Sequence, residues 1–101
     1  MADVIWAETA LAELDVVADY IALDDARAAK KLVQAVVSKT RLLAEFPEMG
    51  SAPEELADLD YRQLLINPCR VFYRISSDQE RVYILHVLRQ EQDFHRFLQP
   101  H

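Results

Sequence analysis

The chain has 101 residues, of which 51% are apolar, and it carries a formal net charge of −6 at pH 7. This length accommodates one hydrophobic core but not two, so we expect a single domain spanning residues 1–101. The acidic balance argues against direct, sequence-specific binding of nucleic acid, and no apolar run approaches the roughly 20 residues that a membrane span requires.

The first two predicted elements are a short strand and a helix. A strand is expected over residues 1–6, where the β-branched residues Val4 and Ile5 precede Trp6. From Glu8 onward, apolar residues recur at helical spacing, which predicts a first helix. Its apolar stripe is expected to comprise Ala10, Leu11, Leu14, Val17 or Ala18, and Ile21.

A second helix is predicted to follow at once. Asp24 and Asp25 can end the first helix and cap the next, because a short carboxylate accepts hydrogen bonds from the unpaired N–H groups at a helix start. This helix is expected to stop before Pro47. Its apolar stripe comprises Ala29, Leu32, Val33, Val36, Thr40, Leu43 and Phe46. The two helices are predicted to form an antiparallel hairpin.

The second half of the chain predicts a loop and then a sheet. Residues 47–55 hold the single glycine and two prolines, which indicates a loop, and a helical turn is expected within residues 54–59. Strand-like runs follow at residues 61–66, 70–75 and 81–88, separated by turn sequences. We therefore expect an α+β fold of order β-α-α-β-β-β, with the helical hairpin packed on an antiparallel sheet.

Alternation along the last run predicts which side chains share a face of the sheet. One face is expected to carry Val82, Ile84, His86 and Leu88. The other is expected to carry Arg81, Tyr83, Leu85, Val87 and Arg89. Residues 90–98 are expected to form a short helix or a tail.

The charges are unevenly distributed along the chain. Residues 1–60 hold 13 acidic and 5 basic residues, a net charge of −8, whereas residues 61–101 hold 4 acidic residues and 6 arginines, a net charge of +2. A guanidinium group binds carboxylates and phosphates through a planar fork, so we expect the partner-binding surface in this second half. The candidate binding residues are Arg62, Arg70, Arg74, Tyr83, Arg89, Phe94 and Phe97. Arg70 is the best single candidate, and the alternative for it is a structural ion pair with a helix carboxylate.

The sequence predicts neither a metal site nor a cofactor. His86, His95 and His101 show no convergent spacing with Cys69, and His86 is expected to be a packed strand residue. No nucleophile elbow or glycine-rich phosphate loop is present. The single cysteine excludes an internal disulfide, and the N-terminus lacks the features of a signal peptide, so we expect a cytoplasmic protein.

Several short sequence words occur in an order typical of one family. They are Val4-x-Trp6 with Ala10-x-x-Glu13-Leu14 and Asp19-Tyr20-Ile21-Ala22, Phe46-Pro47-x-Met49-Gly50, Tyr61-Arg62, Arg70 to Ile75, Val82 to Leu88, and the ending Val87-Leu88-Arg89-Gln90-x-x-Asp93 with Phe97-Leu98. The chain resembles, over nearly its full length, the ParE/RelE superfamily of bacterial toxins from type II toxin–antitoxin pairs. The ending looks more like the ParE branch.

The resemblance implies one scaffold with two activities. ParE-like members inhibit DNA gyrase as binding proteins without a catalytic set, whereas RelE-like members cut mRNA on the ribosome. In the second case the catalytic residues would be Arg70, Arg89, His95 and Arg96. The run at residues 61–66 lacks the lysines expected of a ribonuclease, and a net charge of −6 disfavours ribosomal RNA. A gyrase inhibitor is therefore the leading hypothesis, with a ribonuclease or a member that only binds antitoxin as alternatives.

The resemblance also implies a partner. The cognate antitoxin of ParE-type pairs usually has a ribbon-helix-helix half that binds DNA and a disordered segment that folds over the toxin. Such a segment gains its affinity by laying an amphipathic helix or a strand onto a groove or a sheet edge. We therefore expect a role in plasmid stabilisation, with antitoxin binding as the first interaction.

Overall fold

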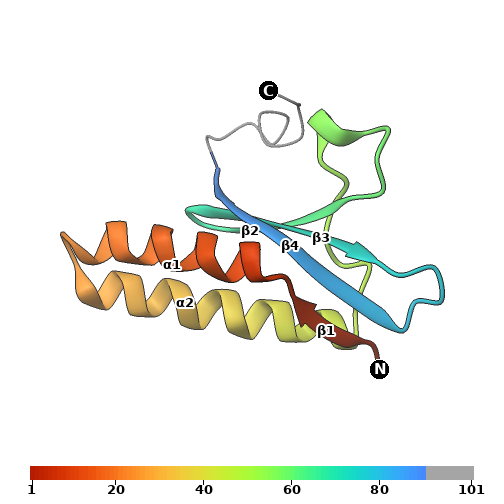
Figure 1. The fold of residues 1–101 in the computed structure, drawn as a ribbon, viewed down its shortest axis with the longest axis horizontal. Helices are drawn as coiled ribbons and strands as arrows, with labels where there is room; N and C mark the ends of the chain where they lie inside the picture. The colour runs from red at the N-terminus through yellow and green to blue at the C-terminus, as the bar shows by residue number, and fades with distance from the viewer. Residues whose placement is uncertain (91–101) are drawn as a thin grey trace.

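The computed structural model describes residues 1–90 as two helices packed against one face of a four-stranded sheet (Figure 1). The elements are β1 (Asp3–Trp6), α1 (Glu8–Ala22), α2 (Ala26–Arg41), the 3₁₀ turns η1 (Leu42–Ala44) and η2 (Glu54–Leu56), β2 (Arg62–Ile66), β3 (Cys69–Ile75) and β4 (Arg81–Arg89). The α+β order predicted from the sequence is confirmed, including the short helical turn in the loop.

The sheet has the strand order β1-β4-β3-β2. The three later strands form the expected antiparallel meander, whereas β1 pairs in parallel with β4, from Asp3 opposite Arg81 to Trp6 opposite Ile84. The sheet is therefore mixed. A parallel neighbour needs a long crossover connection, and here the helical hairpin and the first two meander strands all lie between the paired strands.

An irregularity in β4 changes the predicted faces of its second half. Phe72 pairs with His86 and Tyr73 pairs with Ile84, so Leu85 has no partner in the register. Such a bulge shifts the alternation by one residue. Val82 and Ile84 face the helices as expected, but Val87 continues that face in place of His86 and Leu88. The predicted placement of these last residues was wrong for this reason.

The ends of α2 show one confirmed and one wrong expectation. The Asp25 carboxylate accepts hydrogen bonds from the backbone N–H groups of Arg27 at 3.0 Å and Ala28 at 3.1 Å, which confirms the predicted cap. At the other end, α2 stops at Arg41 and tightens into η1. Phe46 consequently lies beyond the helical stripe and is 56% exposed instead of buried.

The sheet has two unlike faces. The helix face packs against α1 and α2, and the layer between them holds most of the buried residues, among them Leu14 of α1, Val36 of α2 and Val71 of β3. The opposite side, here called the open face, carries a small cluster in which Leu56 packs against Phe72 and Leu88. Residues 51–61, here called the cover segment, bring Leu56 to this position, and Figure 1 shows η2 on the side of the sheet away from the helices.

None of the helices within residues 1–90 is long and apolar enough to cross a membrane.

Candidate functional site

The sheet separates the candidate binding residues into two groups. On β3, Val71 and Tyr73 belong to the core on the helix face, so Arg70 and Arg74 lie on the open face. Tyr83 is opposite Arg74 in the strand register and shares that face. Two other arginines lie on the helix face, because Arg62 pairs with Tyr73 and Arg89 pairs with Cys69. These four arginines, all within residues 1–90, therefore do not form one continuous basic surface.

Arg70 is held by neighbours within the protein. Its side chain forms a two-pronged ion pair with the Glu55 carboxylate, in which Nη1 donates to Oε2 at 2.8 Å and Nη2 donates to Oε1. Its Nε donates to the side-chain oxygen of Gln63 at 3.0 Å, and its guanidinium carbon lies 4.7 Å from the centre of the Phe72 ring. Arg70 is only 9% exposed. These contacts match the structural ion pair that the sequence left open as the alternative.

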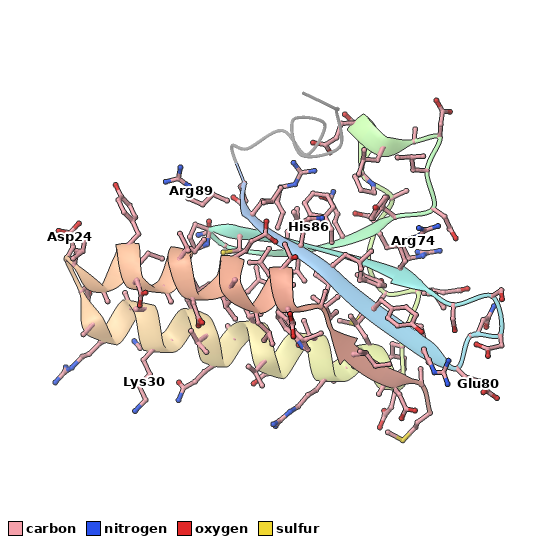
Figure 2. The ribbon with its side chains drawn as sticks, viewed as in Figure 1. Asp24, Lys30, Arg74, Glu80, His86 and Arg89 are labelled. Carbon is pink, nitrogen blue, oxygen red and sulfur yellow. The ribbon has the colours of Figure 1, made fainter. Side chains whose placement is uncertain are left out.

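Arg74 remains exposed on the same face. Its guanidinium lies 5.4 Å from the centre of the Tyr61 ring, at the base of the cover segment. It also lines a shallow hollow with Asp60, Tyr83 and Leu85. Figure 2 shows Arg74 and Arg89 far apart along the molecule, so these two residues do not act on one ligand atom.

Arg62 and Arg89 have separate local contacts on the helix face. Arg62 donates from Nη1 to the backbone oxygens of Glu48 at 3.1 Å and Gly50 at 2.8 Å. Arg89 lies 5.8 Å above the Tyr20 ring of α1. Arg62 therefore stabilises a loop, whereas Arg89 lies beside an exposed helix surface.

The remaining candidates lie outside the described residues. They are Phe94, His95, Arg96 and Phe97. Within residues 1–90, no three His, Cys, Asp or Glu side chains come together in a way that could hold a metal ion.

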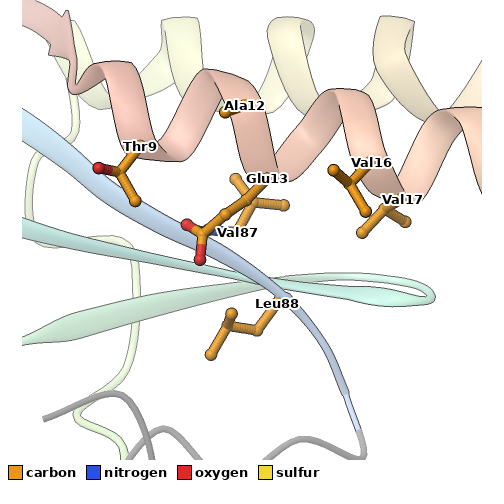
Figure 3. Close-up of a pocket in the computed structure, with 7 residues that line it drawn as sticks. All are labelled: Thr9, Ala12, Glu13, Val16, Val17, Val87 and Leu88. Carbon is orange, nitrogen blue, oxygen red and sulfur yellow. The ribbon is translucent and has the colours of Figure 1, made fainter.

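A groove between α1 and the end of β4 was not predicted from the sequence. It has a volume of about 400 Å³ and opens along the helix (Figure 3). Its lining residues are Thr9, Ala12, Glu13, Val16, Val17, Val87 and Leu88. Val16 is 68% exposed, and the apolar line continues along α1 through Tyr20 to Leu23, the residue just after the helix; both are also exposed. The signal in the sequence was this second line of residues at helical spacing, beside the buried stripe.

Glu13 fixes the sheet edge at the floor of this groove. Because β1 ends opposite Ile84, the later residues of β4 have no neighbouring strand on that side among residues 1–90. The Glu13 carboxylate takes that place, accepting a hydrogen bond from the Val87 N–H at 3.1 Å and contacting Nδ1 of His86 at 3.1 Å. His86 is therefore a packed residue with a partner, as expected from its position in a strand.

Charged side chains border the groove. Asp15 and Asp19 are exposed and each precedes a groove-side residue of α1, so they lie along one side of the apolar line. Arg89 lies above Tyr20 near the end of β4, on the other side. The groove therefore suits an apolar segment of a partner. Basic groups of that segment would face Asp15 and Asp19, and an acidic group would face Arg89.

Comparison with known proteins agrees with this fold. Residues 4–94 match the family model described as ParE toxin of type II toxin-antitoxin system, parDE. The chain is 32% identical over 89 residues to Toxin RelE2 of Caulobacter vibrioides, covering 88% of this chain and 92% of that protein. It is 33% identical over 85 residues to Y4kP of Sinorhizobium fredii, a protein named as a toxin candidate, covering 84% and 88% respectively.

A solved structure gives the same answer. A chain in the structure of the chromosomal ParDE toxin–antitoxin system from P. aeruginosa superimposes with a TM-score of 0.71 at 26% identity. The match covers 90% of this chain and 98% of that chain. The resemblance therefore extends over the whole of the relative and is not limited to one motif.

Proposed function

The chain belongs to the ParE toxin family of type II toxin–antitoxin systems, and from this premise we propose that it inhibits DNA gyrase and is neutralised by a cognate antitoxin. The antitoxin is of the ribbon-helix-helix type, and both partners act in the cytoplasm in a plasmid-stabilisation or equivalent chromosomal pair. In this proposal the protein acts as a binding inhibitor and has no catalytic residues.

The state of Arg70 is the observation that carries this choice. A ribosome-dependent ribonuclease would need this strand arginine to stabilise the charge that develops on a phosphate during cleavage. Here the guanidinium is buried, and Glu55 neutralises its charge. Arg89, the second candidate for such a site, lies on the opposite face of the sheet. The separation of these groups favours an inhibitor that works by binding.

The groove between α1 and β4 supports the antitoxin half of the proposal. An exposed apolar line on a helix, bordered by charge, is a surface that partner proteins cover. A helix of the antitoxin would place apolar side chains over Val16 and Tyr20, with basic residues facing Asp15 and Asp19 and an acidic residue near Arg89.

The test uses the purified full-length chain in two assays. We expect it to block supercoiling by DNA gyrase and to leave protein synthesis in a cell-free bacterial lysate unaffected. Adding the purified antitoxin in equal amount should restore supercoiling. Arrest of translation with cleavage of the mRNA would instead identify the ribonuclease, and no effect in either assay would identify a member that binds only its antitoxin.

A further inference from the structure

A second exposed apolar patch lies beyond the C-terminal end of α2, just after η1. Phe46 is 56% exposed and Met49 is 40% exposed. Together with other residues of the same loop and one residue of the β3–β4 turn, they line a hollow of about 580 Å³. The lining residues are Glu45, Phe46, Pro47, Glu48, Met49 and Gln79, here called the Phe46 patch.

The backbone of this loop is fixed from beneath by a buried tyrosine. The Tyr73 hydroxyl donates to the Pro47 backbone oxygen at 2.7 Å and accepts from the Gly50 N–H at 2.9 Å. Burial raises the pKa of Tyr73 above its usual value, so the hydroxyl keeps its proton at neutral pH and remains a donor. Arg62 adds two hydrogen bonds to backbone oxygens of the same loop. The loop is therefore held at several points along its backbone.

Gly50 shows how closely the loop approaches the sheet. A Cβ atom at this position would lie 2.6 Å from the Gln63 backbone oxygen and 2.6 Å from the Tyr73 hydroxyl. Only glycine permits this approach. Ser51 then continues the contact by exchanging two backbone hydrogen bonds with Gln63, at 3.1 and 2.8 Å. The backbone that carries Phe46 and Met49 is therefore restrained before binding, which lowers the backbone entropy lost on binding a partner.

The charge of the patch points to one kind of partner. Glu45 and Glu48 line the hollow, and within residues 1–90 no basic residue lines it, although Arg62 lies next to it through its hydrogen bond to the Glu48 backbone oxygen. The adjoining β3–β4 turn adds the exposed acids Asp78 and Glu80 (Figure 2 labels Glu80), and the exposed Arg81 follows them, so acidic side chains still outnumber basic ones around the patch. An exposed phenylalanine ring attracts a lysine or arginine over its face, and phenylalanine and methionine are typical contact residues of protein interfaces.

We propose that the Phe46 patch is a docking surface for a basic protein segment that contains an arginine or lysine next to an apolar side chain. This surface is distinct from the groove between α1 and β4. The patch lies beside the turn before β4 and the groove beside its last residues, about 20 Å farther along the strand at roughly 3.3 Å per residue. Both surfaces can therefore be occupied at the same time.

The experiment is a two-dimensional NMR titration of the full chain with two synthetic pentapeptides. In the first peptide a basic residue, arginine or lysine, alternates with leucine. The second peptide has glutamate in place of each basic residue. The basic peptide should shift the amide signals of residues 45–49 and 79, and the acidic peptide should leave them unchanged. Phe46→Ala should weaken binding at least about tenfold, as expected when an anchoring aromatic side chain is removed.

Leu65→Ala is the matched control, because Leu65 is 55% exposed and lies on β2, away from the patch. It should bind the basic peptide as the unmodified protein does, and both variants should keep the same melting temperature. The proposal is overturned if the shifts spread over the acidic residues of α1, if Phe46→Ala binds unchanged, or if both peptides bind equally. Gyrase takes no part in the titration, so failure here and failure of the proposed function are separate results.

Discussion

The arginine-bearing open face and the groove beside α1 differ in how many of their side chains are already in contact with other parts of the protein. On the open face, Arg70 is surrounded by Glu55, Gln63 and the ring of Phe72. Beside α1, by contrast, Val16 and Tyr20 are largely exposed. The comparison teaches that a concentration of arginine in the sequence marks charge but not availability. In the function proposed above, the partner binds at the exposed apolar line on the acidic helix.

The largest effect is expected from removing Arg70, which tests whether the open face is held together by contacts within the protein. Arg70→Ala removes the two-pronged ion pair of the half-buried Glu55 carboxylate, so we expect a loss of about 3 kcal/mol in the free energy of unfolding. Chemical denaturation measures this loss. Arg74→Ala is the control, and because Arg74 is exposed its cost should stay within about 0.5 kcal/mol.

The same variant separates the two activities. If the protein inhibits gyrase by binding, folded Arg70→Ala protein at low temperature should still block supercoiling. A variant that is folded, as judged by circular dichroism, and yet inactive would assign Arg70 a direct part in the activity.

A charge placed in the groove beside α1 tests whether the antitoxin binds there. Val16→Asp puts a carboxylate on an exposed apolar position, so the free energy of unfolding should change by less than about 0.5 kcal/mol. Binding of the antitoxin should weaken by about 2 kcal/mol, or roughly thirtyfold, because the contact would bury an unpaired charge. Isothermal titration calorimetry measures the affinity. Val16→Ile should bind normally, and equal affinity for both variants would place the antitoxin elsewhere.

Tyr73→Phe tests the buried hydroxyl group that holds the loop beneath the Phe46 patch. The variant loses the hydrogen bonds to Pro47 and Gly50 and should be about 1–2 kcal/mol less stable at pH 7. The pKa of Tyr73 is raised in the folded state, so its contribution is fully present below pH 10 and declines as the pH rises through the folded-state pKa. The difference between the two proteins should therefore narrow above pH 10. A constant difference up to pH 11 would contradict this assignment.

The smallest effect is expected at the β3–β4 turn. The Ser76 hydroxyl donates to the Asp78 carboxylate at 2.5 Å and the Glu80 N–H donates to it at 3.0 Å, and these bonds lower the pKa of Asp78. A lowered pKa contributes stability above the unfolded-state value of 3.8, which is lost as the pH falls through the folded-state value. Asp78→Asn should melt slightly earlier than the unmodified protein at pH 7, and this difference should disappear near pH 2.

Local patterns predicted the elements, because helices and strands differ in the spacing of their apolar residues. The parallel pairing of β1 with β4 could not be predicted, since strand partners are chosen by tertiary packing. The bulge at Leu85 was hidden because residues 82–88 are nearly all apolar and leave little alternation to interpret.

The site was harder to predict than the fold. The partner of Arg70 comes from a 3₁₀ turn 15 residues earlier, a distance at which spacing gives no information. Phe46 was assigned to a buried stripe because its position fits the helical period, but the helix had already ended at Arg41. That Arg89 lies beside the groove follows only from the packing of α1 against β4, which the sequence pattern does not show.

The carboxylate of Glu13 also protects the edge of the sheet against pairing with other chains. An unpaired strand edge is a template on which further chains can add, and native proteins protect such edges with charged side chains. By holding the Val87 N–H, Glu13 withholds one hydrogen-bond donor from any incoming strand. The contact therefore leaves the edge of β4 with fewer free groups on which a strand of another molecule could pair.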